Sequence, residues 1–456
     1  MKTATLSRMS TPAQLAAVAI AVLAVTLGPL LLLNAWRRNS IWSALLVVAV
    51  VAATLRSTGV QALESSLWSP VYGVALVLLG LFALVSPEPR WRRRLGGSLA
   101  PVVLLLGFVA YSLTVSLLFG ELDTVPVVGL LLILFALIAA YIFRWGDSDL
   151  LWRDARAALD CVVVLVCFSV ALGLAGVSDA FGYYGRLQGL WGNPNYLALA
   201  SALLLVYETS RLLRPSTTFV RMLNGLVLVI GFVALIWSGS RGGAAAAFFG
   251  VVVCVLIQVR NPLSTWRVVV VALGVVAVGL AGRSSVAAFL RHGEQFTSID
   301  SGRTEIWSEF ASQLTFFGSG LFSTRPVVTD ETAALMYEVN PQADLAPHNI
   351  FLQVAVEVGM IGLLLFTTFL LVTIFARSRV YPHALLIGLV ATALAYELSE
   401  SSVFAAGGPL TLIVWTLILM LGRAGTSLPR LENQPAHVGG VGGRGQPELA
   451  QVDVGS

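Results

Sequence analysis

Charged side chains are scarce in this chain of 456 residues, where Asp, Glu, Lys and Arg together make up 11%. Soluble proteins carry about a quarter charged residues, and a chain this poor in charge cannot cover a large water-facing surface. The composition therefore excludes a soluble globular domain, a disordered protein and a collagen-like fibre. Lysine is almost absent, because Lys2 is the only lysine, and the net charge of +4 gives no argument for a nucleic-acid partner.

Cysteine and histidine are also rare. The three cysteines all lie inside apolar runs: Cys161, Cys167 and Cys254. They indicate small buried side chains, so a disulfide scaffold is excluded. The four histidines are scattered along the chain: His292, His348, His383 and His437. No pair of them has the spacing of metal ligands, so the sequence predicts no metal site.

Apolar residues are abundant, at 57% of the chain with a mean hydropathy of +0.85. They form up to about 13 runs, most of them long enough to cross a membrane. The runs occupy residues 13–33, 41–55, 71–86, 99–119, 125–143, 159–177, 195–213, 222–238, 242–259, 266–281, 349–376, 384–404 and 409–422. This pattern predicts an all-α fold, a polytopic transmembrane helical bundle of about 12 spans with an irregular first run. The exact number of spans and the side of the N-terminus stay open.

Arginines mark alternate connections between these runs, and such connections belong on the cytoplasmic side. They cluster at residues 90–94, 144–156, 211–221, 260–267 and 377–379. Residues 1–422 are therefore predicted to form the membrane domain, with residues 282–348 as a long extracytoplasmic loop. We expect a short amphipathic helix from Thr304 to Phe317 in that loop. Residues 423–456, rich in Gly and Pro, are predicted to be a disordered cytoplasmic tail.

Three arginines fall on the outer side, against this charge bias. Arg186, Arg241 and Arg303 each lie in a turn of small residues, and Asn193 and Asn195 follow the first of them. Glycine lets a backbone approach a ligand closely, and arginine binds phosphate through two parallel hydrogen bonds. The pattern favours a phosphate site. The alternative is that these arginines bind lipid headgroups or pair with acidic residues of the loop.

Other ionisable residues lie at the edge of the membrane. His348, followed by Asn349, ends the long loop, and a neutral imidazole there could accept a proton from a hydroxyl group. The alternative is a histidine that only helps Asn349 to cap the next helix. Glu357 lies about two turns into its span, while Glu397 and Glu400 are three residues apart and would share a helix face. We expect these acids to orient the arginines or His348, or to form structural ion pairs.

Five motifs occur in one order along the outer side of the chain. They are GRLQGLWGNPN, SGSRGG, SGRTEIW, FFGSGLF and PHNIFLQVAVEVGMIG, all between residues 180 and 365. Each motif is short, but together they resemble the O-antigen ligase and O-antigen polymerase superfamily. The first half of the chain adds only a compatible hydropathy.

The resemblance implies a membrane glycosyltransferase of the cell membrane with its site at the extracytoplasmic face. It implies an undecaprenyl-diphosphate-linked glycan as donor, a hydroxyl group as acceptor, and no metal or other cofactor. Arg186, Arg241 and Arg303 would hold the diphosphate, and His348 would be the general base of an inverting displacement. Ligase and polymerase cannot be separated, and the sugar, the acceptor and the oligomeric state stay open.

Two other classes of function remain as alternatives. A secondary transporter or a flippase of lipid-linked glycan would show charged or broken spans at mid-membrane in corresponding positions of two halves. The polar residues of this chain instead gather at one face, and no internal repeat is evident. A non-enzymatic membrane scaffold is the third possibility.

Overall fold

The computed structural model describes most of the chain between residues 41 and 427. The described ranges are 41–58, 66–85, 99–119, 124–145, 148–182, 185–214, 216–258, 303–321, 347–375, 384–400 and 408–427, with Val60 and Leu63. Within them the regular structure is helical, and one isolated bridge pairs Phe181 with Leu187. This confirms the predicted all-α fold.

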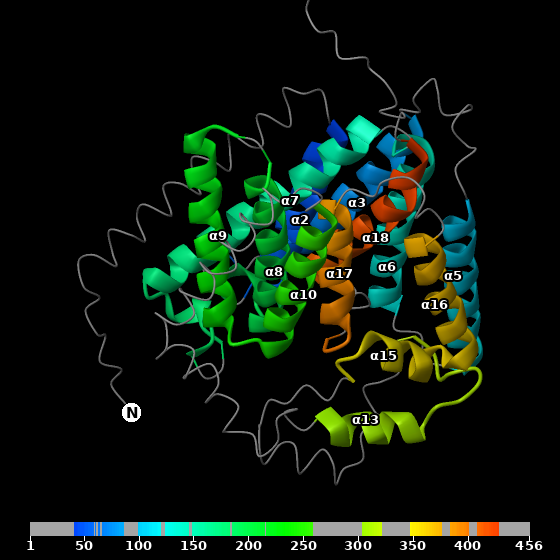
Figure 1. The fold of residues 1–456 in the computed structure, drawn as a ribbon. Coiled ribbons are helices and arrows are strands. Elements are labelled where there is room, and N and C mark those ends of the chain that lie inside the picture. The colour runs from blue at the N-terminus through cyan, green and yellow to red at the C-terminus, as the bar shows by residue number, and fades with distance from the viewer. Residues whose placement is uncertain are drawn as a thin grey trace, which may run out of the picture.

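Long helices run side by side, and two short ones, α13 and α15, lie across one end of them (Figure 1). The helices are α2 (Ile41–Arg56), α3 (Trp68–Val85), α5 (Ala100–Phe119), α6 (Thr124–Ala139), the π-helix η2 (Ala140–Arg144), α7 (Ser148–Leu174), the 3-10 turns η3 (Ser178–Ala180) and η5 (Gly189–Trp191), α8 (Pro194–Leu212), α9 (Thr218–Ser238), α10 (Arg241–Gln258), α13 (Arg303–Ser312), α15 (Ile350–Glu357), α16 (Gly359–Phe375), α17 (Ala384–Glu397) and α18 (Pro409–Ser427). The predicted runs 13–33 and 266–281 lie outside the described residues.

Six helices of the described chain are long and apolar enough to cross a membrane: α3, α5, α6 with η2, α7, α9 and α10. Four shorter apolar helices accompany them: α2, α16, α17 and most of α18. Large apolar side chains point outward from several of these helices, as Val103 (62% exposed), Phe219 (76%) and Phe248 (75%) show. Such uncovered apolar faces fit a hydrocarbon surrounding, so the chain is a membrane protein. The count of 12 spans stays a prediction.

Helix α8 lies inside the bundle, where α7, α9, α10 and α17 surround it. Every residue from Leu197 to Ser210 is buried. Near the end of α8, Tyr207 donates a hydrogen bond to Asp160 (2.9 Å) and Arg211 donates one to Glu208 (3.0 Å). Buried polar groups need hydrogen-bond partners, and Asp160 of α7 and Arg211 of α8 supply two of them here.

A buried ion pair joins three helices at the end of the bundle where arginines gather. Arg144 donates two hydrogen bonds to Asp154, at 2.7 and 3.0 Å, and Trp145 Nε1 donates a third at 3.2 Å. Ser43 Oγ of α2 donates a fourth. Asp154 is completely buried, so this group links α2, η2 and α7 through one carboxylate.

Replacement of Asp154 by alanine should therefore destabilise the bundle strongly. It would leave the Arg144 guanidinium, only 10% exposed, without its carboxylate. Breaking a buried pair in this way costs about 3–5 kcal/mol. Thermal unfolding in detergent should show a large fall in midpoint. Ser43→Ala removes a single hydrogen bond to the carboxylate, worth about 1.5–3 kcal/mol, so a larger loss for Ser43→Ala than for Asp154→Ala would contradict this account.

The structure corrects two predictions about the segment around the long loop. Residues 349–376 were expected to be one span, but the chain breaks at Val358 into α15 and α16, because Gly359 adopts φ +76°. Backbone bonds from outside the helix fix this break: Gly320 N donates to Glu357 O (2.8 Å) and Met360 N to Thr315 O (3.0 Å). The amphipathic helix expected up to Phe317 ends at Ser312, where the chain turns to make these bonds.

Three other boundaries differ from expectation. Helix α7 begins at Ser148, within the segment assigned to a cytoplasmic connection. Helix α18 continues to Ser427, past the expected tail boundary at residue 422, and Arg423 is buried over the ring of Tyr141 at 5.4 Å from the ring centroid. Glu397 ends α17 and Glu400 follows the turn after it, so the prediction that they share a helix face was wrong. Residues 428–456 and most of 282–348 lie outside the described residues.

Candidate functional site

Four side chains from distant segments form one hydrogen-bonded group at the end of the bundle that α13 and α15 cross. Arg186 Nη2 donates to Asn195 Oδ1 (2.8 Å), and Asn195 Nδ2 donates to Glu400 Oε1 (2.8 Å). The other carboxylate oxygen of Glu400 lies 2.9 Å from His348 Nδ1. We call Arg186, Asn195, Glu400 and His348 the polar relay. It joins a fixed cation to an imidazole through a shared carboxylate.

Arg186 is held by the turn between α9 and α10. Its Nε donates to Ser238 O (2.7 Å), and the neighbouring Leu187 N donates to Trp237 O (3.0 Å). Gly239 has φ +65°, and a Cβ added there would lie 3.2 Å from Arg186 Nε. Glycine therefore permits both the left-handed turn and the close approach of the guanidinium.

Asn195 lies in the first turn of α8, where several contacts hold it. Asn193 caps the helix, since its side chain accepts a hydrogen bond from Asn195 N (2.8 Å). Tyr396 OH donates to Asn195 O (2.9 Å). A guanidinium can only donate and a carboxylate can only accept, so the partners of Asn195 set the orientation of its amide. Asn193 acts on the relay only through the helix that it caps.

The backbone of His348 is unusual. Its φ of +47° is the only positive φ of a non-glycine residue in the described part of the chain. Asn349 caps α15 by accepting from Phe351 N (3.0 Å), and its own amide donates to Leu398 O (3.1 Å). Trp307 Nε1 of α13 donates to Pro347 O (2.6 Å). Such a conformation costs about 1–3 kcal/mol and clusters at functional sites, so the surrounding contacts hold His348 in place.

The relay is shielded but reachable. The side chain of His348 is 20% exposed and that of Glu400 is 10% exposed. In such a partly desolvated place the hydrogen bonds of the relay are stronger than on an open surface.

Arg241 and Arg303 begin two helices at the same end of the bundle. Arg241 starts α10, and a Cβ on the next residue, Gly242, would collide with Ser399 Oγ, so this turn packs on the turn that carries Glu400. Arg303 starts α13, and Trp307 of the same helix contacts Pro347 beside His348. The side chain of Arg303 lies outside the described residues.

Glu357 and Glu397 are not members of the relay. Glu357 ends α15, at the opposite end of that helix from His348, and its carboxylate accepts from Gln353 Nε2 (3.0 Å). Glu397 is completely buried at the end of α17. The sequence reasoning missed Tyr396, Trp307 and Ser238, although the first two carry hydrogen-bond donors on apolar side chains, a sign that could have pointed to them.

The cysteines Cys161, Cys167 and Cys254 are buried and free, as the apolar runs predicted. Within the described ranges, no three His, Cys, Asp or Glu side chains gather in a way that could hold a metal ion.

Apolar helices around an inner α8, with a polar relay at one end, define a polytopic membrane protein with a terminal polar site. Residues 226–367 match the family model described as O-antigen ligase. This match confirms the superfamily resemblance that the motifs indicated, and it supports a membrane glycan-transfer function of the ligase or polymerase type. The match includes Arg241, Arg303 and His348. Among curated proteins, no sequence matches this chain.

Proposed function

We propose that this protein is a glycosyltransferase of the cell membrane. It transfers or polymerises glycan from an undecaprenyl-diphosphate-linked donor to an acceptor hydroxyl, at the extracytoplasmic face. The observation that carries the proposal is the polar relay, because it links an anion-binding guanidinium to a proton-accepting imidazole. Three of its members, Arg186, Asn195 and Glu400, lie outside the matched family residues, so they support the proposal independently of the match.

The charge of the two ends supports the extracytoplasmic placement. The end of the bundle opposite the relay carries several arginines: Arg144 after α6, Arg153 and Arg156 near the start of α7, Arg211 in the last turn of α8, and Arg214 after it. Arginines concentrate on the cytoplasmic side of membrane proteins. The relay would then face outward, where lipid-linked glycan is displayed.

His348 would act as the general base. Glu400 engages Nδ1, so a proton from the acceptor hydroxyl would go to Nε2, and the carboxylate would stabilise the imidazolium that forms. The acceptor oxygen bonds to the anomeric carbon as the bond from that carbon to the diphosphate oxygen breaks. The electron pair leaves with the diphosphate. Attack from the opposite side inverts the anomeric configuration.

The arginines would stabilise the leaving group. Negative charge grows on the diphosphate oxygens as the glycosidic bond breaks, and guanidinium groups already in place can offset it. Arg186 is anchored by Ser238 and Asn195, which fixes its plane before the donor arrives. Arg241 and Arg303 would complete the diphosphate site.

The proposed chemistry needs no metal ion, which gives a direct prediction. Transfer by the purified protein should continue in excess EDTA at close to the untreated rate, because guanidinium groups supply the charge stabilisation. The measurement is release of undecaprenyl diphosphate over time with and without the chelator. A loss of activity that Mg²⁺ or Mn²⁺ restores would contradict metal independence.

A transporter or flippase receives less support. The break between α15 and α16 is the kind of discontinuity that transporters use. However, α15 lies across the end of the bundle (Figure 1), while binding sites of transporters lie near mid-membrane. The polar relay also lies at that end.

One reconstitution experiment tests the proposal. The protein, in liposomes with an undecaprenyl-diphosphate glycan and excess glycan acceptor, should release the lipid diphosphate in step with a longer or transferred glycan. Arg221→Ala, which changes an exposed arginine at the other end of the bundle, is the control and should keep the wild-type rate. Movement of the lipid-linked glycan across the bilayer without bond cleavage would identify a flippase instead.

A further inference from the structure

The strained backbone of His348 is held from both sides. The torsion φ is the rotation about the bond from N to Cα, so its value depends on where the planar peptide group before it lies. The oxygen of that peptide group, Pro347 O, accepts a hydrogen bond from Trp307 Nε1 at 2.6 Å. On the other side, Asn349 caps α15 and donates to Leu398 O (3.1 Å). Trp307 therefore holds one end of the torsion whose value is +47°, and the contacts of Asn349 hold the other.

Helix α13, which carries Trp307, packs along α15. Ile306 (2% exposed) and Phe310 (0%) are buried, so α13 has an apolar face turned toward the protein. Figure 1 shows α13 beside α15 at the end of the bundle. The indole of Trp307 is thus carried by a packed helix, and its position depends on how α13 sits on α15.

The chain after α13 is joined to the far end of α15. Gly320 N donates to Glu357 O (2.8 Å). Gly318 and Gly359 both have positive φ and lie against each other: a Cβ added to Gly318 would be 2.5 Å from Gly359 N, and the reverse distance is also 2.5 Å. Only glycine permits two backbones to approach so closely. Helix α13 is therefore attached to α15 twice, through Trp307 at the start of α15 and through this glycine contact at its end.

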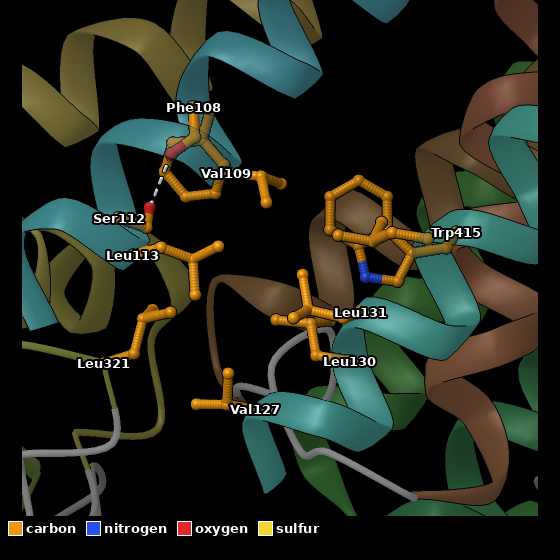
Figure 2. Close-up of a pocket in the computed structure, with 10 residues that line it drawn as sticks. Phe108, Val109, Ser112, Leu113, Val127, Leu130, Leu131, Leu321 and Trp415 are labelled. Carbon is orange, nitrogen blue, oxygen red and sulfur yellow. Dashed lines mark hydrogen bonds between the residues drawn. The ribbon is translucent and has the colours of Figure 1, made fainter. Parts of the chain in front are cut away.

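The same segment is attached to the long helices of the bundle. Leu321 N donates to Ser116 Oγ of α5 (2.8 Å), and Leu321 is only 5% exposed. Figure 2 shows Leu321 with Leu113 of α5 in the lining of a small apolar pocket. The pair of helices α13 and α15 is thus anchored on the bundle, which sets the place of Trp307 relative to the polar relay.

We propose that Trp307 is a positioning residue for His348. By holding the carbonyl of Pro347, its indole N–H keeps the imidazole at Glu400 and within reach of the acceptor hydroxyl. This inference rests on the proposed function, in which His348 is the general base. Without the bond, His348 would relax toward the negative φ that residues other than glycine prefer, and its ring would turn away from Glu400. Because Arg303 begins the same helix, α13 would also connect the base to one arginine of the proposed diphosphate site.

Solid-state NMR of nitrogen-15 labelled histidine tests this role without relying on activity. The chain has four histidines, and His348→Asn identifies the His348 signals by their loss. The carboxylate of Glu400 can only accept, so Nδ1 of a neutral His348 carries the proton in the wild-type protein. Trp307→Phe keeps an aromatic ring but has no N–H. It should reduce the Nδ1–H signal of His348 as Glu400→Ala does, and leave the other histidines unchanged.

Trp68→Phe is the matched control. Trp68 Nε1 also donates to a backbone carbonyl, Leu63 O (3.0 Å), at the start of α3. This variant should keep the wild-type proportion of Nδ1–H at His348. A wild-type proportion in Trp307→Phe, or an equal loss in both tryptophan variants, would overturn the proposal.

Kinetics provide a second readout. Trp307→Phe should lower kcat about 10- to 100-fold and change the KM for the donor less than about twofold, because it displaces a catalytic group without removing a donor contact. In the His348→Asn protein, which has no base to position, the same replacement should cause no further loss. An equal loss in both backgrounds would show that Trp307 acts on the fold rather than on His348, and would contradict the proposal.

The two proposals can fail separately. Loss of the His348 Nδ1–H signal in Trp307→Phe, in a protein that transfers no glycan, would keep Trp307 as the residue that positions His348 and overturn the transferase. Glycan transfer by a protein whose His348 signals and kcat do not respond to Trp307→Phe would overturn the role of Trp307 and leave the transferase.

Discussion

Replacement of His348 by asparagine is expected to lower the rate of glycan transfer by about 10²- to 10⁴-fold, the usual contribution of a general base. Asparagine tolerates the left-handed backbone that His348 adopts at φ +47°, so the fold at this position should persist. Its amide cannot take a proton from the acceptor. The measurement is the single-turnover rate at saturating donor.

The variant needs controls for folding and position. His383→Asn changes a histidine that the arginine pattern places on the cytoplasmic side, and it should keep the wild-type rate. The wild-type rate should also fall as the pH drops, because protonation of His348 removes its ability to accept a proton, and His348→Asn should lose this dependence. An unchanged rate of glycan transfer by a properly inserted His348→Asn protein would contradict the proposal that His348 is the general base.

Replacement of Arg186 by lysine is the second change with a large expected effect. Lysine keeps the charge, but its single ammonium nitrogen cannot replace the planar guanidinium. It cannot donate hydrogen bonds to Ser238 O, Asn195 Oδ1 and a phosphate group in the same geometry. Loss of one donor to a developing charge costs about 10²- to 10³-fold in kcat. We expect a loss of this size in kcat, measured as release of undecaprenyl diphosphate at saturating donor.

The effect of Arg186→Lys on kcat and KM distinguishes stabilisation of the leaving group from simple attraction of the donor. If Arg186 only attracted the donor, Arg186→Lys would raise KM and leave kcat intact. Arg221→Lys, at an exposed position at the opposite end of the bundle, serves as the matched control. A wild-type kcat for Arg186→Lys would contradict its role in stabilising the leaving group.

The relay also explains what Glu400 does for the histidine. Its carboxylate is shared between Asn195 and His348, so it orients the imidazole and ties it to Arg186. Donor diphosphate bound at Arg186 would therefore act on the same hydrogen-bonded group that holds the base. Under the proposed function Glu400 and Asn195 would be positioning residues. Asn193 and Asn349 cap α8 and α15.

The helices were predictable from the sequence because apolar runs are local features. Each predicted run in the described chain coincides with helix, although α15 and α16 divide one of them. That break depends on bonds from residues 315–320 to the helix ends, and neighbouring residues alone do not reveal such contacts. Gly359 and Gly362 look equivalent in the sequence, yet only Gly359 adopts a positive φ.

All four members of the polar relay could be singled out in the sequence, but the hydrogen bonds that join them could not. Arg186 stood out because it departs from the charge bias, and His348 because it is an imidazole at the membrane boundary. Asn195 and Glu400 lie 205 residues apart, and no periodicity links them. The spacing of Glu397 and Glu400 predicted that they share a helix face, and this was wrong because α17 ends at Glu397. Tertiary packing, which brings the ends of α8 and α17 together, decides which acid meets the histidine.

The most direct test of the central claim is a single-turnover assay in liposomes with donor, acceptor and the wild-type, His348→Asn or Arg186→Lys protein. The relay predicts that wild-type protein releases undecaprenyl diphosphate and transfers glycan in equal amounts, and that each variant slows both steps together by at least about 10²-fold. Equal rates in all three proteins, or glycan movement without release of the lipid diphosphate, would contradict it.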